Sequence, residues 1–259
     1  MKSFVKQWFS APEKVSDKPE PSIKSGERIY CIGDVHGRHD LLLKIHRMIE
    51  SDSADYDGLR KVVYLGDLVD RGMDSDKVLD ELLQRPLAGF ESILLMGNHE
   101  QTMLDFLEYP RQAAGWLSWG GRETLASYGV PLPKGMVNPD VDGIRDDLRS
   151  HLPEAHVELL RSMVLFHASG DFMFVHAGIR PGIPMQEQSD SDLLWIRNDF
   201  LDDESEHGFM VVHGHTISEE VQVRPNRIGI DTGAYRTGVL TCLVLEGANK
   251  RFLQTGVVT

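Results

Sequence analysis

The chain contains 259 residues, which is enough for one large domain or two small ones with a sizeable core. Asp and Glu total 40 against 27 Lys and Arg, and the net charge of −13 argues against a general surface for nucleic acid or other polyanions. No window approaches the roughly 18 apolar residues of a membrane span, and both cysteines lie in apolar, strand-like runs, so we expect a protein of the reducing cytoplasm without a membrane partner.

The N-terminal region differs in composition from the rest of the chain. Residues 1–26 are rich in Lys, Ser and Pro and contain no apolar core of signal-peptide length, which is typical of a flexible segment. We therefore expect a flexible N-terminal segment at residues 1–26, followed by a single folded domain at residues 27–259. The sequence does not predict an oligomeric state.

Strands and helices alternate in the next part of the chain. Strand-like runs are found at residues 28–34, 61–67 and 92–98, and helical patterns lie between them at residues 40–50 and 74–85. Such alternation indicates βαβ units, in which successive strands are parallel. The region is therefore predicted to form one parallel sheet with helices on its surface.

Residues 101–162 have a mostly helical pattern, with an interruption rich in Pro and Gly at residues 129–139. We interpret this region as a helical insertion. Five shorter strand-like runs follow, at residues 172–178, 209–216, 226–232, 239–246 and 252–258. The last four are too closely spaced for helical crossovers, so we expect them to form a second, more antiparallel sheet.

Polar side chains follow each of the first three strand candidates, directly after a glycine. They are Asp34 and His36, then Asp67, Asp70 and Arg71, then Asn98, His99 and Glu100. Two later strands end in imidazoles, at His176 and His215. Because ligands gather at the carboxyl ends of parallel strands, we expect these groups to converge on one edge. Mixed oxygen and nitrogen donors suit manganese, iron or zinc better than calcium, and their number indicates two metal ions.

The segments GDVHG, GDLVDRG, GNHE, HAG and HGHT resemble the motifs of the calcineurin-like metallophosphoesterases, specifically the bacterial and phage members of the serine/threonine phosphoprotein phosphatase branch. The resemblance extends roughly over residues 28–245. It implies an α/β fold in which two mixed β-sheets pack as a sandwich flanked by helices. It also implies six ligands for two divalent ions, manganese first and iron or zinc as alternatives: Asp34 and His36 on one ion, Asp67 between the two, and Asn98, His176 and His215 on the other.

The same resemblance implies how a phosphate ester would be hydrolysed. A water shared by the two metals would attack phosphorus in line while Arg71 neutralises the phosphate oxygens. His99 matches the family's proton donor to the leaving oxygen, and Asp70 matches the carboxylate that orients it. Arg197 resembles an arginine that clamps phosphate, with a surface helix arginine as the alternative. Asp231 either lines the site or stabilises a turn.

Three hypotheses for the activity follow. The leading one is a metal-dependent serine/threonine protein phosphatase whose substrate is a phosphorylated protein. The main alternative is a dinucleoside polyphosphate hydrolase resembling the symmetrical diadenosine tetraphosphatases, which typically have alanine in place of Asp70 and aspartate in place of Glu100. The third is an inactive binding module, which should have lost metal ligands, whereas this chain retains all of them.

Overall fold

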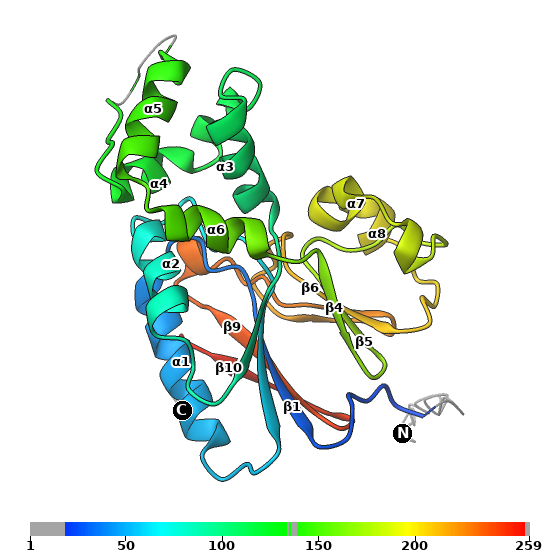
Figure 1. Ribbon diagram of the computed structural model, residues 1–259. Helices are drawn as coiled ribbons and strands as arrows, with labels where there is room; N and C mark the ends of the chain where they lie inside the picture. The colour runs from blue at the N-terminus through cyan, green and yellow to red at the C-terminus, as the bar shows by residue number, and fades with distance from the viewer. Residues whose placement is uncertain (1–18, 134, 136–138, 257–259) are drawn as a thin grey trace, which may run out of the picture.

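The computed structural model describes residues 19–133, 135 and 139–256, which form two five-stranded sheets (Figure 1). The first sheet has the strand order β10-β9-β1-β2-β3. Its members are β1 (Glu27–Ile32), β2 (Leu59–Tyr64), β3 (Glu91–Leu94), β9 (Thr241–Glu246) and β10 (Asn249–Gln254). Strands β1, β2 and β3 are parallel, as predicted, and β9 is antiparallel to both of its neighbours.

The second sheet has the order β4-β5-β6-β8-β7. Its members are β4 (Phe166–Ser169), β5 (Phe172–Val175), β6 (Met210–His213), β7 (Gln222–Val223) and β8 (Arg227–Gly229). The three central strands β5, β6 and β8 are parallel, and the two edge strands are antiparallel to their neighbours. Both sheets are therefore mixed.

Alternating side chains of β1 show how the layers pack. Ile29 and Cys31 belong to a buried cluster that also contains Phe172 and Phe174 of the second sheet, so this cluster fills the space between the sheets. Tyr30 and Ile32 belong to a different cluster, which they share with apolar residues of the helices. Successive strand residues point to opposite faces, so β1 is buried on both. The predicted sandwich of two mixed sheets flanked by helices is confirmed.

Helices α1 (His39–Ser53) and α2 (Ser75–Gln84) connect the parallel strands and pack on the outer face of the first sheet. In α1 the buried apolar residues Leu41, Leu42, Ile45 and Ile49 recur at helical spacing and give one apolar stripe. The carboxyl ends of β1 and β2 thus run into loops that stay at one edge of the sheet, where their polar residues meet.

The predicted helical insertion is confirmed. It contains α3 (Asn98–Glu108), the 3-10 helix η1 (Ala114–Ser118), α4 (Gly121–Ser127), α5 (Val141–His151) and α6 (Glu154–Ser162). In Figure 1 helices α3, α4 and α5 rise above the sheets on one side, opposite the pair α7 (Asp190–Trp195) and α8 (Asn198–Leu201). The predicted interruption at residues 129–139 falls between α4 and α5 and lies partly outside the described residues.

The prediction that the last four strand-like runs form a second, more antiparallel sheet is wrong. Strands β9 and β10 return to the first sheet, where β9 pairs with β1. Strands β6 and β8 pair in parallel in the second sheet, because residues 214–226 loop back and bring β8 alongside β6. Spacing along the chain limits the length of a connection, but it does not determine which strand becomes the neighbour.

The N-terminal boundary also differs from the expected one. Ile23 is buried in the cluster between the sheets, and its backbone N–H donates to the carbonyl of Gly247 at 3.0 Å. The backbone N–H of Ser22 donates to Asp171 Oδ2 at 3.0 Å. The ordered part thus begins before residue 26, while residues 1–18 lie outside the described residues and their flexibility stays a prediction. Among the helices of the described part, none has the length and apolarity needed to cross a membrane.

Candidate active site

The six predicted metal ligands converge on the carboxyl edge of the two sheets. Asp67 Oδ2 lies 3.4 Å from His36 Nε2, and Asp67 Oδ1 lies 3.4 Å from His176 Nε2. Asn98 Oδ1 lies 2.9 Å from His176 Nε2 and 2.8 Å from His215 Nδ1. The set is completed by Asp34, whose Oδ2 accepts the backbone N–H of His215 at 3.0 Å. Asp67 is therefore central, between ligands from both sheets.

Backbone carbonyls orient two of the imidazoles. His36 Nδ1 lies 2.9 Å from the carbonyl of Val69, and His176 Nδ1 lies 2.7 Å from the carbonyl of Leu65. A carbonyl only accepts, so Nδ1 carries the proton in both rings and Nε2 is left with a lone pair available to a metal ion. A second-sphere hydrogen bond of this kind is typical of histidines that bind metals.

The donor atoms fit a metal centre. Ligand atoms of His36, Asp67 and His99 lie within 4.8 Å of one another, as do those of Asp67, His176 and His215, and either group could hold an ion. Two buried atoms of the predicted set, Asp34 Oδ1 and His215 Nε2, have no hydrogen-bond partner. Buried polar atoms normally have one, so an ion that satisfies them is the simplest explanation.

Electrostatics lead to the same conclusion. Burial raises the pKa of Asp34 well above its usual value, and the neighbouring carboxylates of Asp231 and Asp67 raise it further. Burial lowers the pKa of His36 to about 3 and that of His215 to about 2, so both imidazoles are neutral at pH 7. None of the six predicted ligands carries a positive charge, and bound cations would balance the carboxylates of Asp34 and Asp67.

The loops that carry these ligands have an unusual backbone. Five described residues other than glycine have positive φ: His36, Asp67, Asp70, Arg71 and His215, at 47° to 72°. All five belong to the predicted site. Side chains are rarely found in this left-handed region, because Cβ crowds the following carbonyl.

Glu100 holds one of these strained loops. Its carboxylate accepts backbone N–H groups of Asp67 at 2.8 Å, Leu68 at 2.7 Å and Val69 at 3.1 Å, and also that of Gly97 in a capping box at the start of α3. Burial raises the pKa of Glu100 to about 7. The sequence analysis gave Glu100 no structural role, although an acidic residue three positions after an N-cap is the usual signal of a capping box.

His99 and Asp70 form the predicted hydrogen-bonded pair, with 2.7 Å between His99 Nδ1 and Asp70 Oδ2. Burial alone would lower the pKa of His99, but the carboxylates of Asp67 and Asp70 raise it above its usual value. The carboxylates thus favour the protonated imidazole, while the positive charge of Arg71 next to Nε2 opposes protonation. Its Nε2 lies 3.8 Å from Asp67 Oδ2, at the edge of the metal-ligand cluster.

The insertion fixes Asp70 in place, which the sequence analysis did not predict. Trp116 Nε1 donates to Asp70 Oδ2 at 2.8 Å, and the hydroxyl of Thr124 donates to Asp70 Oδ1 at 2.6 Å. These residues come from η1 and α4. Both lie more than forty positions from Asp70 along the chain, so no local pattern indicated the contact.

The two arginines are placed differently. The Arg71 guanidinium lies 2.6 Å from His36 Nε2 and 2.9 Å from His99 Nε2, where it can donate only to a neutral ring, and it lies over the ring of Tyr235. Arg197 is exposed at the start of α8, and its guanidinium donates to the hydroxyl of Thr216 at 3.4 Å, next to His215. Arg71 therefore reaches into the ligand cluster, whereas Arg197 lies at its outer rim.

Asp231, for which the sequence left two roles open, shows features of both. Its Oδ1 accepts the backbone N–H of Gly233 at 2.9 Å, which stabilises the turn. Its Oδ2 is buried without a hydrogen-bond partner, and its charge raises the pKa of Asp34. Burial raises the pKa of Asp231 itself to about 6.

Comparison with known proteins identifies this arrangement. Residues 27–236 match the family model of the calcineurin-like phosphoesterases. This match covers most of the chain, so the protein belongs to that family, whose members are metal-dependent hydrolases of phosphoric esters. The two-sheet fold and the His and Asp groups around Asp67 are those expected of such an enzyme.

Individual relatives differ in the activity that their names carry. The chain is 34% identical over 161 residues to a symmetrical bis(5'-nucleosyl)-tetraphosphatase of Delftia acidovorans. This alignment covers 61% of this chain but only 47% of that protein. It is 25% identical over 239 residues to an asymmetrical bis(5'-nucleosyl)-tetraphosphatase of Oceanobacillus iheyensis, covering 83% of this chain and 87% of that one. It is also 28% identical to Shewanella-like protein phosphatase 2 of Arabidopsis thaliana, over 65% of this chain and 50% of that protein.

Solved structures agree on the fold. A putative diadenosine tetraphosphatase superposes with a TM-score of 0.58 at 22% identity, covering 88% of this chain and 93% of the other. At this level of identity the likeness concerns the arrangement of strands and helices. It supports the two-sheet architecture independently of the motifs.

Proposed function

We propose that the protein hydrolyses dinucleoside polyphosphates, such as diadenosine tetraphosphate, at a centre of two divalent metal ions. The observation that carries the hydrolase part is the buried cluster around Asp67, with its unpaired donor atoms on Asp34 and His215. Asp34 and His36 would hold one ion, and Asp67 would be shared. The second ion would be held by Asn98, His176 and His215. Manganese is the proposed ion, with iron or zinc as alternatives, because the donors are mixed oxygen and nitrogen.

The residues of the chain have separate roles in this mechanism. When bound, the metals would acidify a water for attack on phosphorus and neutralise phosphate charge. Arg71 and Arg197 would pair with phosphate oxygens from the inner and outer side of the cluster. As the bond from phosphorus to the leaving oxygen breaks, His99 would give that oxygen the proton from Nε2. Asp70 would keep the imidazole in the orientation that allows this transfer.

The choice of substrate reverses the order expected from the sequence motifs. Those motifs favoured a serine/threonine protein phosphatase, mainly because Asp70 and Glu100 depart from the symmetrical tetraphosphatases. However, the relatives that align with most of this chain are named as asymmetrical bis(5'-nucleosyl)-tetraphosphatases, at 82–83% coverage. This supports a dinucleotide over a phosphoprotein as the first substrate to test.

Phosphoprotein hydrolysis remains the second candidate, because a specific contact favours it. The hydrogen bond to Asp70 orients the imidazole of His99, which would protonate a poor leaving group. The alkoxide of phosphoserine is such a group. The relative from Arabidopsis thaliana, which is named as a protein phosphatase, is consistent with this activity.

Assays with the metal-reconstituted protein distinguish the candidates. We would compare kcat/KM for diadenosine tetraphosphate, a phosphoserine peptide and an aryl phosphate, and identify the nucleotide products. The proposal expects the highest value for the dinucleotide. A higher value for the phosphopeptide would replace it with the phosphatase hypothesis, and no turnover of any substrate would indicate a binding module.

We also propose the cytoplasm as the compartment. Cys31 and Cys242 are both free thiols in the described structure, and both are buried. Free buried thiols are common in proteins that work in reducing surroundings. Fractionation of the cells that produce the protein, followed by detection with an antibody, would test the location.

A further inference from the structure

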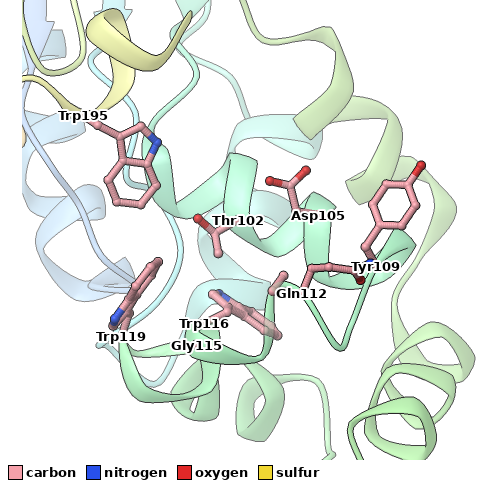
Figure 2. Close-up of a pocket in the computed structure, with 9 residues that line it drawn as sticks. Thr102, Asp105, Tyr109, Gln112, Gly115, Trp116, Trp119 and Trp195 are labelled. Atoms are coloured by element: carbon pink, nitrogen blue, oxygen red, sulfur yellow. The ribbon is translucent and has the colours of Figure 1, made fainter.

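A cavity of about 610 Å³ opens next to the proposed active site. Figure 2 shows that Thr102 and Asp105 project into it from α3, between Trp195 and Trp119 at one end and Tyr109 at the other. Four of the nine lining residues are aromatic, and the lining comes from the helical insertion and from the C-terminal end of α7. We call this cavity the indole pocket, after Trp119 and Trp195.

The two tryptophans are exposed in a way that packing does not explain. Their ring centroids are 5.7 Å apart at an interplanar angle of 66°, and their exposed fractions are 49% for Trp119 and 37% for Trp195. Tyr109 is 63% exposed on the far side. Aromatic rings that face solvent inside a cavity offer flat apolar surfaces, which bind planar ligands by stacking.

The polar groups of the pocket suit a nucleobase. The side chain of Asp105 is exposed, and its Oδ1 already accepts a hydrogen bond from Gln101, so Asp105 presents acceptor oxygens to the pocket. Gln112 adds an amide to the same lining. Purine bases carry N–H donors on the ring edge, and a carboxylate accepts from such donors while the ring stacks on an indole.

The pocket lies beside the proposed active site. The ring of Trp195 lies 6.3 Å from that of His215, measured between centroids. On the other wall, Trp119 precedes Gly120, whose carbonyl accepts the backbone N–H of Arg71 at 3.2 Å. A base bound against this pair of tryptophans would therefore lie beside the metal-ligand cluster.

We infer that the indole pocket binds one purine base of the substrate against the edge-to-face pair of Trp119 and Trp195, by stacking on its exposed indole surface. This inference rests on the proposed function, since it assigns a subsite to the dinucleotide substrate. A phosphoprotein would need no such planar surface. The pocket thus provides a physical reason for the enzyme to distinguish a nucleotide ester from another phosphate ester.

The test uses three substitutions in the pocket and one control. Trp195→Ala and Trp119→Ala each remove one stacking face, and Trp195→Phe retains a smaller aromatic ring. The control is Phe166→Ala, which removes an aromatic side chain that is 41% exposed on β4, outside the pocket. Far-UV circular dichroism and metal content confirm that each protein is folded and loaded.

Two readouts separate this inference from the proposed function. The first is binding of adenosine, which has no phosphate, measured by isothermal titration calorimetry. We expect each alanine variant to weaken it by about 10-fold or more, and Trp195→Phe and Phe166→Ala to weaken it much less. The second is the KM for diadenosine tetraphosphate, which should rise by a similar factor in the alanine variants, with a smaller rise for an aryl phosphate.

The outcomes are distinct. If the wild-type protein hydrolyses the dinucleotide and the alanine variants keep its KM and their affinity for adenosine, the pocket inference is wrong and the proposed function stands. If the wild-type protein binds adenosine through the tryptophans but does not hydrolyse the dinucleotide, the proposed function is wrong and the pocket remains a nucleoside site. Absence of adenosine binding by the wild-type protein would also overturn the inference.

Discussion

The metal-ligand cluster and the indole pocket are neighbours built on different principles. The ligands follow regular strands, and Asp34, His36 and Asp67 are each no more than 2% exposed. The pocket comes from the helical insertion and α7, and three of its aromatic rings, Tyr109, Trp119 and Trp195, are 37% to 63% exposed, while Trp116 is buried. The chemical step is thus placed on loops that follow the strands, whereas the proposed substrate selection is placed on the helical insertion and α7. The insertion also holds Asp70 through Trp116 and Thr124.

The largest effect that this comparison predicts is the loss of metal. Chelation should lower kcat by more than about 10³-fold for every substrate, because the attacking water depends on the ions, and added manganese should restore it. Adenosine binding in the indole pocket should persist in the same metal-free sample. Full activity in a sample shown by elemental analysis to be metal-free would contradict the mechanism.

The second largest effect should come from replacing Asp67, the ligand proposed to be shared by the two ions. Asp67→Asn removes a charge from the centre of the cluster and should reduce both the number of bound ions and the rate. Asp146→Asn on α5 serves as the matched control, since Asp146 is an exposed carboxylate outside both regions. Metal content by mass spectrometry decides the role: two ions in Asp67→Asn at the wild-type rate would exclude Asp67 as the shared ligand.

His99→Asn should have a more selective effect. The variant should retain both ions but hydrolyse a phosphoserine peptide about 10²- to 10⁴-fold more slowly, because the alkoxide leaves without a proton. An aryl phosphate, whose leaving group needs less assistance, should be affected less.

Rates on a series of aryl phosphates with graded leaving-group pKa check this assignment. Removal of the orienting carboxylate in Asp70→Asn should give a weaker form of the same trend, and the double variant should be much less than additive. Equal slowing across the series, with both ions bound, would show that His99 positions the substrate instead of donating a proton.

The smallest effect should come from a region that belongs to neither site. Asp52 accepts a hydrogen bond from Tyr30 at 2.6 Å and is paired with Arg251 of β10. Burial alone would raise the pKa of Asp52, but the hydrogen bonds from Arg251 and Tyr30 lower it below its usual value. Because the pKa of Asp52 is lower in the folded than in the unfolded state, its carboxylate stabilises the folded state at pH values above the unfolded pKa of about 4. This contribution is lost as the pH falls through the folded pKa.

Asp52→Asn should therefore reduce the free energy of unfolding by about 1 kcal/mol at pH 7. The difference from wild type should shrink toward pH 3. Urea denaturation at several pH values would measure it, and kcat/KM for each substrate should stay unchanged. A difference independent of pH would show that the charge of Asp52 is not the stabilising feature.

The sequence predicted the parts of the molecule that depend on local pattern. Glycine followed by Asp, Asn or His at strand ends indicated the cluster, and Asp34, Asp67 and Asn98 lie there. The pairing of β9 with β1 was missed, because an apolar run does not specify its neighbour in the sheet. The contacts of Trp116 and Thr124 with Asp70 were missed for the same reason, since they join segments that are distant in the chain.

The five left-handed residues of the site have a consequence for the evolution of this protein. Each costs on the order of 1 kcal/mol relative to a relaxed backbone, and together they are a substantial fraction of the 5–15 kcal/mol by which a typical domain is stable. Glycine at His36, Asp67 or His215 would remove the strain, but it would also delete the side chain that the site needs. Selection for heat resistance is therefore confined to other positions, and the catalytic loops stay the least optimised part of an otherwise well-packed sandwich.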